Sequence, residues 1–286
     1  MSIIEKAVAR IGKTSAPSDN TRPAENTAVG HVDSTVGRFN KITVCHLNVK
    51  ALKEQGYLTS GDKNSRFAEQ YRQIKRPLLK NAFSKMGDHP VENGNLIMVT
   101  SAIHGEGKTF TAMNLALSIA LEKDTTVLLV DCDLEKPKLS RLLGVESQTG
   151  LIDILDNPGK DLGEAIIGTD INNFRIMPAG RPNEFSTELL ASETMYNIAQ
   201  ELSKRYSDRV IIFDAPPFLG STQARVLTDF VGQILVVVAA GETNKNIVRE
   251  LTQSIRGNKI VGMVLNKCKP DISNVYRGYG EEHGRE

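Results

Sequence analysis

The sequence is poor in several features that mark particular classes of protein. Among its 286 residues there is no tryptophan, and there are only three cysteines, Cys45, Cys132 and Cys268. These cysteines show no CxxC spacing and no pairing with histidines, which argues against a zinc site. An odd and sparse cysteine count also argues against a disulfide framework and fits a reducing compartment.

The sequence also lacks long apolar runs and an excess of charge of one sign. No apolar stretch approaches the ~20 residues that span a bilayer. The start, MSIIEKAVARIGK, has charges among its apolar residues and so lacks the core of a signal peptide. The formal net charge of +1 gives no reason to expect nucleic acid as a partner. We therefore expect a cytoplasmic protein.

The first 37 residues differ in composition from the rest of the chain. Residues 3–12 predict a short amphipathic helix that docks on the protein or contacts a membrane, and residues 13–37 have few large apolar side chains. Because such a segment cannot bury enough surface to offset its ordering entropy, residues 1–37 are predicted to be a short helix and a flexible linker. A globular domain is predicted over 38–268, followed by a flexible tail over 269–286.

Apolar strands and helices alternate along the predicted domain. It begins with a helix over residues 64–75, which Pro77 should kink or end. The later predicted strands are 95–100, 126–131, 173–177, 209–214, 233–239 and 260–265, and the later predicted helices are 108–122, 185–206, 221–229 and 243–256. This alternation predicts an α/β fold with a doubly wound, mostly parallel sheet flanked by helices, in which ligands bind at the carboxyl ends of the strands.

Residues 102–109, AIHGEGKT, match a phosphate-binding P-loop except that alanine replaces the first glycine. Gly105 and Gly107 allow the backbone to bring its N–H groups to phosphate oxygens. Lys108 adds positive charge at the β- and γ-phosphates, and Thr109 offers a hydroxyl to Mg²⁺. A glycine-rich turn without a ligand is the alternative, but a strand before the loop and a helix after it favour a P-loop NTPase.

Two predicted strands end in carboxylates. Asp131 and Asp133 follow VLLV, and Asp214 follows VIIF. Carboxylates at these ends hold Mg²⁺ directly or through water, and one of them can accept a proton from a nucleophile. The alternative, that Asp131 or Asp214 caps the next turn, explains either residue alone but not all three together with the P-loop. Asn266, after the last strand, is predicted either to contact the adenine base or to belong to a plain turn.

One loop position separates two functional classes. P-loop proteins with an aspartate at the end of the following strand include the partition and division-site ATPases, which carry a signature lysine early in the loop. The matching residue here is Ile103. A ParA/MinD-like ATPase switch without kinase activity therefore remains an alternative that lacks its diagnostic residue. A nucleotide-binding scaffold without turnover is a further alternative.

Several motifs together resemble the bacterial tyrosine kinases (BY-kinases) of polysaccharide export systems. The resemblance runs from about residue 66 to the end and includes SAIHGEGKTFTAMNLA, LLVDCDLEKPKLSRLLGV, GLIDIL, IMPAG, ELLASETM, VIIFDAPP and VLNK. Within this family the sequence is most similar to the stand-alone tyrosine autokinase of exosortase-associated exopolysaccharide loci, on the wording IKRPLL, FDAPP and MSIIEKA. The resemblance implies an ATP-dependent autokinase that uses Mg²⁺ and regulates exopolysaccharide synthesis or export.

The resemblance also implies a role for each residue of these motifs. Lys108, Asp131 and Asp133 would be catalytic, with one of the two aspartates as the base for a tyrosine hydroxyl. The metal would be held by Thr109, Asp131 and Asp214. The nucleotide would be held by His104, Gly105, Glu106, Gly107, Lys108, Thr109, Phe110 and Asn266. Two positions depart from the family: His104 stands where proline is frequent, and Glu135 stands where a basic residue is frequent.

A charged helix is implied to join subunits. The run EQYRQIKR resembles the E-x-x-R-x-x-R motif that assembles the family into rings, and it supplies Glu69, Arg72, Lys75 and Arg76. Helical spacing puts Glu69, Arg72 and Arg76 near one face, and a solvated charged face is the alternative. The resemblance further implies a membrane-embedded partner, similar to a polysaccharide co-polymerase, whose cytoplasmic segment activates the kinase and recruits it to the inner face of the plasma membrane.

The tail contains two of the six tyrosines of the chain. Tyr276 and Tyr279 lie among Gly, Arg and Glu, in a segment with little to build a core. They are the predicted autophosphorylation sites, modified in trans by a neighbouring subunit. An ordinary disordered tail is the alternative.

Overall fold

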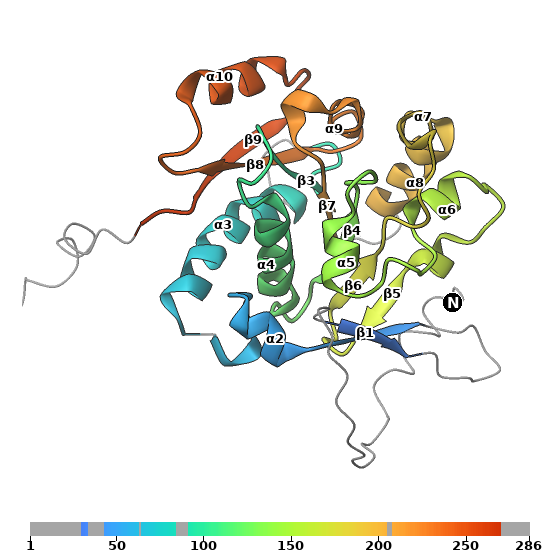
Figure 1. Cartoon of the computed structure of the whole chain (residues 1–286), viewed down its shortest axis with the longest axis horizontal. Helices are drawn as coiled ribbons and strands as arrows, with labels where there is room; N and C mark the ends of the chain where they lie inside the picture. The colour runs from blue at the N-terminus through green and yellow to red at the C-terminus, as the bar shows by residue number, and fades with distance from the viewer. Residues whose placement is uncertain (1–29, 34–42, 63, 84–90, 205–207, 270–286) are drawn as a thin grey trace, which may run out of the picture.

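The computed structural model describes residues 30–33, 43–62, 64–83, 91–204 and 208–269. The strands of these residues form one twisted sheet (Figure 1). The strands are β1 (Gly30–Asp33), β2 (Val44–Leu47), β3 (Leu96–Ser101), β4 (Thr126–Asp131), β5 (Ile167–Thr169), β6 (Phe174–Met177), β7 (Arg209–Asp214), β8 (Gln233–Ala239) and β9 (Ile260–Asn266). Their order across the sheet is β1-β2-β5-β6-β4-β7-β3-β8-β9. Only the pairs β1–β2 and β5–β6 are antiparallel, which confirms the predicted mostly parallel α/β sheet.

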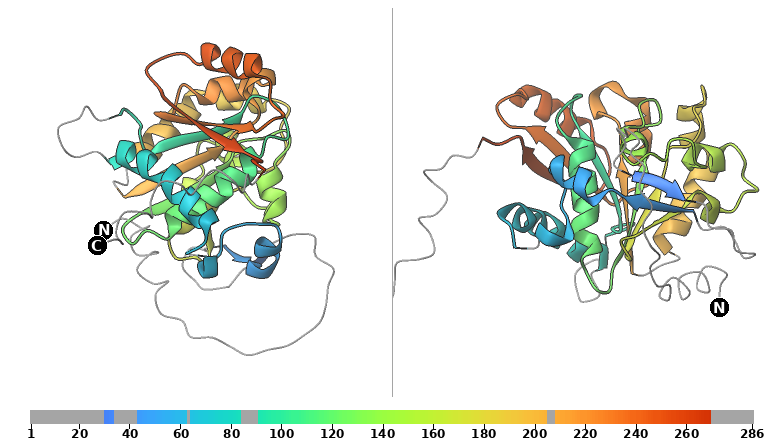
Figure 2. Two further views of the ribbon diagram at one scale, coloured as in Figure 1. Left: turned by 90° about the vertical axis from the view of Figure 1, so that its left-hand side faces the viewer. Right: turned by 60° about the horizontal axis from the view of Figure 1, so that its bottom comes forward.

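Helices cover both faces of this sheet, as the two further views show (Figure 2). They are α2 (Val49–Glu54), α3 (Arg66–Phe83), α4 (Lys108–Ala120), α5 (Lys138–Leu142), α6 (Leu151–Leu155), α7 (Ser186–Leu190), α8 (Glu193–Lys204), α9 (Thr222–Leu227) and α10 (Lys245–Ser254), with short 3₁₀ turns η1 (Ser60–Asp62), η2 (Leu162–Ala165) and η3 (Phe218–Gly220). One apolar core lies under α2–α5 and the other under α6–α10. The central strands are buried on both faces, which explains their continuous apolar sequences.

Two helices differ from their predicted extents. Helix α3 continues through Pro77, where the sequence predicts a kink or an end. Because Tyr71 and Leu78 are buried on either side of an exposed proline, packing against the core outweighs the lost backbone hydrogen bond. The single helix predicted over 185–206 is instead α7 and α8. Ser192 lies between them, and its hydroxyl accepts a hydrogen bond from Met195 N at 3.3 Å, as a helix N-cap does.

Strands β1, β2 and β5, at one edge of the sheet, were not predicted from the sequence. Strand β1 lies within the segment predicted to be a linker, so that prediction is wrong for Gly30–Asp33. Strands β2 and β5 are only four and three residues long, too short to show a periodic pattern in the sequence. The predicted helix over 3–12 lies outside the described residues. Within the described residues no helix is both long enough and apolar enough to cross a membrane.

Candidate active site

The phosphate loop connects β3 to α4 and has a backbone that requires glycine. Gly105 and Gly107 have φ angles of +88° and +97°, in the left-handed region that other residues rarely adopt. A Cβ atom on Gly107 would also overlap with Nδ2 of Asn266. The loop conformation therefore favours glycine at both positions, and the close approach of the end of β9 is a second reason at Gly107 alone.

Lys108 lies at the first turn of α4 and points toward the strand ends. Its Nζ is 2.8 Å from Oδ2 of Asp133, and both side chains are buried. Burial lowers the pKa of Lys108, but the negative charges of Asp214 and Asp133 outweigh burial and raise the pKa overall. Lys108 is thus a buried cation among carboxylates, which is the charge arrangement that a phosphate group and a divalent cation would complete.

Asp131 ends β4 and is held by its neighbours. Its Oδ2 accepts hydrogen bonds from Ser140 N at 2.8 Å and from Ser140 Oγ at 2.7 Å, and its Oδ1 accepts one from Asp133 N at 3.3 Å. Burial, together with the charge of Asp214, raises the pKa of Asp131 to about 7. Ser140 belongs to α5, and the sequence analysis did not assign it a role, although it lies within the motif LEKPKLSRLLGV.

Asp214 ends β7 directly beside Asp131, since the two residues are register partners in the sheet. The residue is fully buried, yet neither carboxylate oxygen has a hydrogen-bond partner within the described residues. Burial raises the pKa of Asp214 to about 6, although the charge of Lys108 and the nearby hydroxyl of Thr109 oppose this shift. A buried carboxylate without partners is costly, so Asp214 fits a site that a cation completes.

The residues present fit a nucleotide-bound Mg²⁺ better than a metal held by protein alone. In the part of the chain that the structure describes, no group of three or more His, Cys, Asp or Glu side chains is arranged to hold a metal. Mg²⁺ in phosphate-transfer sites usually needs only one or two carboxylates, with phosphates and waters as its other ligands. The two free oxygens of Asp214, with Thr109 at the start of α4, meet that requirement.

The other residues predicted to hold the nucleotide differ in their surroundings. His104 is exposed at the tip of the loop, whereas Glu106 is buried beneath it. Phe110 packs against Tyr57, with ring centroids 5.1 Å apart. Asn266 donates a hydrogen bond from Nδ2 to the carbonyl oxygen of Glu106 at 2.9 Å. In this structure Asn266 therefore supports the loop itself, and contact with an adenine base stays a prediction.

Glu135, which departs from the family pattern, lies near a buried glutamine that the sequence analysis missed. Gln223 in α9 is 2% exposed. Its Nε2 lies 3.5 Å from Oε1 of Glu135 and donates to Ser186 Oγ at 3.1 Å. A glutamine at the start of a short helix carries no recognisable signal in a single sequence. The exposed Glu135 is thus in contact with α9 through an amide.

The four charged residues of α3 do not share one environment. Lys75 is 5% exposed, and its Nζ donates to the carbonyl oxygen of Ser118 at 2.6 Å. It also pairs with Oε1 of Glu122 at 2.6 Å, so its side chain faces α4 and not a surface that another subunit could reach. The prediction of Lys75 as a contact between subunits is corrected on this point. Arg72 pairs with Glu69 at 2.8 Å on the outer face, and Arg76 is exposed.

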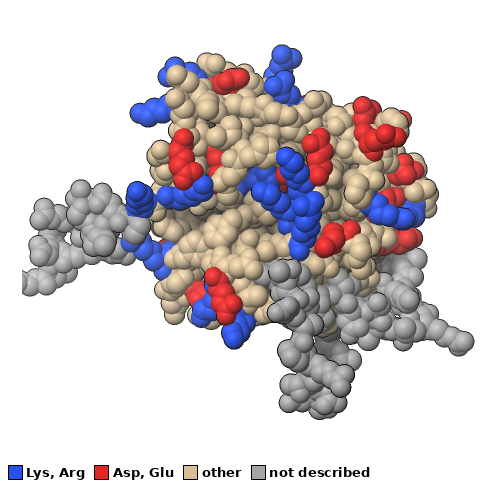
Figure 3. All heavy atoms as spheres, in the orientation of Figure 1, with Lys and Arg blue, Asp and Glu red and all other residues tan. Residues whose placement is uncertain are grey.

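The tail tyrosines Tyr276 and Tyr279 lie outside the described residues, so the structure gives no account of them. Near the middle of the face shown in Figure 3, in the region of α5, Lys and Arg side chains form a cluster. Asp and Glu side chains lie mostly toward its margins. A positive surface of this kind attracts anions.

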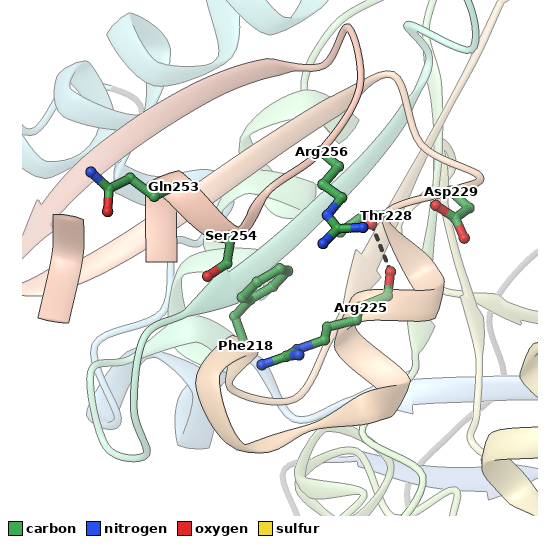
Figure 4. Close-up of a pocket in the computed structure, with 7 residues that line it drawn as sticks. All are labelled: Phe218, Arg225, Thr228, Asp229, Gln253, Ser254 and Arg256. Atoms are coloured by element: carbon green, nitrogen blue, oxygen red, sulfur yellow. Dashed lines mark hydrogen bonds between the residues drawn. The ribbon is translucent and has the colours of Figure 1, made fainter. Parts of the chain in front are cut away.

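A cavity of about 540 Å³ contains none of the predicted site residues (Figure 4). It lies at the carboxyl ends of α9 and α10 and is lined by Phe218, Arg225, Thr228, Asp229, Gln253, Ser254 and Arg256. Arg225 lies in the last turn of α9 and Arg256 follows α10, positions at which a cation offsets the negative end of a helix dipole. Helix ends thus account for both arginines, and we assign no ligand to this cavity.

The fold and the site together define a P-loop nucleotide-binding protein. The AAA domain family (AAA_31) matches residues 94–261, which cover the phosphate loop and both carboxylate-bearing strands. Among curated proteins, the chain is 29% identical over 245 residues to tyrosine-protein kinase YwqD of Bacillus subtilis, covering 85% of this chain and 95% of that protein. It is 35% identical over 184 residues to tyrosine-protein kinase CpsD of Streptococcus pneumoniae, covering 62% and 77%.

A solved structure agrees with these sequence matches. The kinase domain of the Escherichia coli tyrosine kinase ETK superposes with a TM-score of 0.59 at 25% identity, covering 80% of this chain and 92% of that one. The chain belongs to the family of bacterial tyrosine-protein kinases, and its P-loop lies in an AAA domain.

Proposed function

We propose that the protein is an ATP-dependent protein tyrosine autokinase that phosphorylates its own tail. The observation that carries the proposal is the cluster of Lys108, Asp131, Asp133 and Asp214 at the phosphate loop, in which Asp214 keeps two buried oxygens without partners. Phosphoryl transfer depends mainly on positioning and on neutralising charge, and this cluster provides both. Family membership supports tyrosine as the acceptor.

Of Asp131 at the end of β4 and Asp133 two residues beyond it, the contacts favour Asp133 as the base. Both oxygens of Asp131 accept hydrogen bonds from Ser140 and Asp133, whereas Oδ1 of Asp133 accepts one from Lys136 N at 3.3 Å and its Oδ2 is paired with Lys108. When ATP binds, its phosphates compete for Lys108, and this competition frees Oδ2 of Asp133. The tyrosine oxygen then bonds to the γ-phosphorus, the bond from that phosphorus to the β,γ-bridging oxygen breaks, ADP leaves, and the hydroxyl proton goes to Asp133.

Bound Mg²⁺ would supply charge neutralisation at the β- and γ-phosphates. Thr109 and Asp214 would hold it, with Asp131 beside Asp214 as the third predicted ligand. Both oxygens of Asp131 accept hydrogen bonds, from Ser140 and Asp133, so Asp131 would contribute to holding the metal through water.

The acceptors in this proposal are Tyr276 and Tyr279 of a neighbouring subunit, in a ring joined through Glu69, Arg72 and Arg76. Glu69 and Arg76 are exposed on α3, which supports a contact between subunits there, whereas Lys75 is buried and pairs with Glu122. Phosphorylation adds about −1.5 to −2 charges to each tyrosine, which would disfavour return of the tail to a site with three aspartates and so loosen the ring. Activation and recruitment by the cytoplasmic segment of a membrane partner, and regulation of exopolysaccharide synthesis or export, complete the proposal.

The test is intact-mass and phosphopeptide analysis of the purified full chain after incubation with ATP and Mg²⁺. Wild-type protein should carry phosphate on Tyr276 or Tyr279, and Lys108→Met should carry none. The double variant Tyr276→Phe/Tyr279→Phe should lose most phosphotyrosine and still bind ATP. Tyr196→Phe is the matched control, because Tyr196 is exposed on α8 and lies outside the proposed acceptor segment.

Two outcomes would contradict the proposal in different ways. Undiminished labelling of the double variant would place the acceptor elsewhere in the chain. Release of free phosphate with no phosphotyrosine, even when a membrane partner's cytoplasmic segment is added, would identify a ParA/MinD-like ATPase switch instead.

A further inference from the structure

Glu106 stands between the two glycines of the phosphate loop, yet its side chain is turned inward. It is 1% exposed, whereas its neighbours His104 and Gly105 are exposed. A carboxylate in a loop that binds phosphate repels the ligand unless other groups offset its charge. A glutamate is also rarely buried to this extent without partners. The partners of this carboxylate therefore indicate what it does.

The carboxylate joins the start of the phosphate loop to the end of a different strand. Its Oε2 accepts a hydrogen bond from Ile103 N at 2.7 Å. Its Oε1 accepts one from Ala239 N at 3.4 Å, at the end of β8, and another from the hydroxyl of Thr243 in the turn that follows. Three donors, none of them Lys108, thus satisfy both oxygens of the Glu106 carboxylate.

A second set of contacts ties the same loop to β9. Asn266 donates from Nδ2 to the carbonyl oxygen of Glu106, and its own carbonyl oxygen accepts from Ala240 N at 2.8 Å. The backbone N–H of Thr243 in turn donates to the carbonyl oxygen of Ala239 at 3.1 Å. The phosphate loop, the end of β8 and the end of β9 therefore form one hydrogen-bonded unit, which closes around the Glu106 side chain.

We propose that Glu106 is a positioning residue that holds the phosphate loop in its phosphate-binding shape, with Thr243 as its anchor on the β8–α10 turn. Nucleotide affinity would then depend on a turn that carries none of the predicted phosphate-binding residues. The inference rests on the proposed function only in taking ATP as the nucleotide. Glu106 acts through the backbone of Ile103 and does not touch the reacting atoms.

The test compares variants that keep the size of a side chain but lose a hydrogen bond, Glu106→Gln and Thr243→Val, with Thr243→Ser, which keeps the hydroxyl. Glu106→Gln replaces one acceptor oxygen by an NH₂ group that must face a donor. It should weaken ATP binding and raise KM for ATP about tenfold or more, with kcat at saturating ATP within about threefold of wild type. Thr243→Val removes the hydroxyl at nearly constant size and should weaken ATP binding about fivefold, whereas Thr243→Ser should restore it.

The readouts are equilibrium binding of a fluorescent ATP analogue, the separate values of KM and kcat, and the melting temperature. Thr252→Val is the matched control, because the Thr252 hydroxyl donates to Arg249 O on the exposed side of α10. The double variant Glu106→Gln/Thr243→Val should weaken binding by less than the product of the two single effects, since both residues belong to one network.

Wild-type affinity in Glu106→Gln, or a fall in kcat with KM unchanged, would overturn the inference. A lower melting temperature with unchanged ATP affinity in both Glu106→Gln and Thr243→Val would also overturn it, because that result indicates a purely structural role. Nucleotide binding decides this question even if wild-type protein forms no phosphotyrosine, so failure of the proposed function can be told apart from failure of this inference.

Discussion

Asp131 and Asp214 occupy equivalent places at the ends of two neighbouring strands, yet their surroundings differ. They are register partners in the sheet, and both are buried. Asp131 accepts three hydrogen bonds, from Ser140 and from the backbone of Asp133. Asp214 accepts none from the described residues. The comparison indicates that one carboxylate is fixed by the protein, while the other is left for a ligand.

The difference between Asp131 and Asp214 also affects the stability of the nucleotide-free protein. Hydrogen bonds from Ser140 and Asp133 offset part of the cost of burying Asp131, although burial and the charge of Asp214 still raise its pKa to about 7. Asp214 is buried near two other carboxylates with Lys108 as the nearby cation, so the nucleotide-free protein bears an uncompensated cost there. Burial of charge therefore costs stability at both carboxylates, and only Asp131 accepts hydrogen bonds from the described residues that offset part of this cost.

The largest expected effect is that of replacing Asp214 or Asp131 by asparagine, which has nearly the same shape and no charge. Asp214→Asn should reduce autophosphorylation about 100-fold or more, because Mg²⁺ loses its free carboxylate. It should also raise the stability of the nucleotide-free protein at pH 8, because a buried charge among like charges is removed. Asp131→Asn should be less stable than Asp214→Asn by about 1–3 kcal/mol, because its NH₂ group faces donors.

Phosphotyrosine formation and urea unfolding of the nucleotide-free variants measure these two effects. Asp124→Asn, at an exposed carboxylate, is the control and should change neither. Equal loss of stability in Asp131→Asn and Asp214→Asn would contradict the contrast between the two sites.

A smaller effect is expected in the pH dependence of stability. The pKa values of Asp131 and Asp214 rise from 3.8 to about 7 and about 6 on folding. The folded state therefore binds protons more tightly than the unfolded state, and stability should fall as pH rises from about 4 to 7. The contribution of Asp214 is on the order of 2 kcal/mol. Unfolding at pH 5.5 and pH 8 should show a smaller difference in Asp214→Asn than in wild type, and an equal difference would contradict the assigned direction.

The smallest expected effect sharpens the description of Asp131. Ser140→Ala removes the hydroxyl that donates to Asp131 at 2.7 Å and accepts from Ala179 N at 3.1 Å. It should cost about 1–2 kcal/mol of stability and reduce autophosphorylation by less than about tenfold, because the backbone N–H of Ser140 still holds the carboxylate. Ser147→Ala, at an exposed serine, is the control for urea unfolding and phosphotransfer. A loss as large as that of Asp214→Asn would mean that Asp131 itself binds the metal directly.

Sequence reasoning succeeded where a local pattern determines the outcome. The run VLLV before Asp131 and the run VIIF before Asp214 predict buried strands with carboxylates at their ends, and the structure places them side by side. The glycines of the phosphate loop likewise predict its conformation. Strand period and residue type were enough in these cases.

Other features depend on contacts between distant parts of the chain. The difference between Asp131 and Asp214 comes from Ser140 on another element, and the inward turn of Glu106 comes from Thr243, far along the chain. Helical spacing in α3 gives the direction of each side chain but not which neighbour it meets, so the sequence could not show that Lys75 faces α4. Packing decides these outcomes, and a single sequence does not display it.

The buried Lys75 also has a consequence for the electrostatics of α4. Its ammonium group binds the carbonyl oxygen of Ser118 in the last turn of α4, at the negative end of that helix's macrodipole. The opposite, positive end of the same macrodipole begins at Lys108 in the phosphate loop. A single helix thus has a cation of its own chain at one pole and a predicted anion site at the other. The basic residue at position 75 therefore belongs to the electrostatics of α4 and its phosphate-binding end, although it lies on α3.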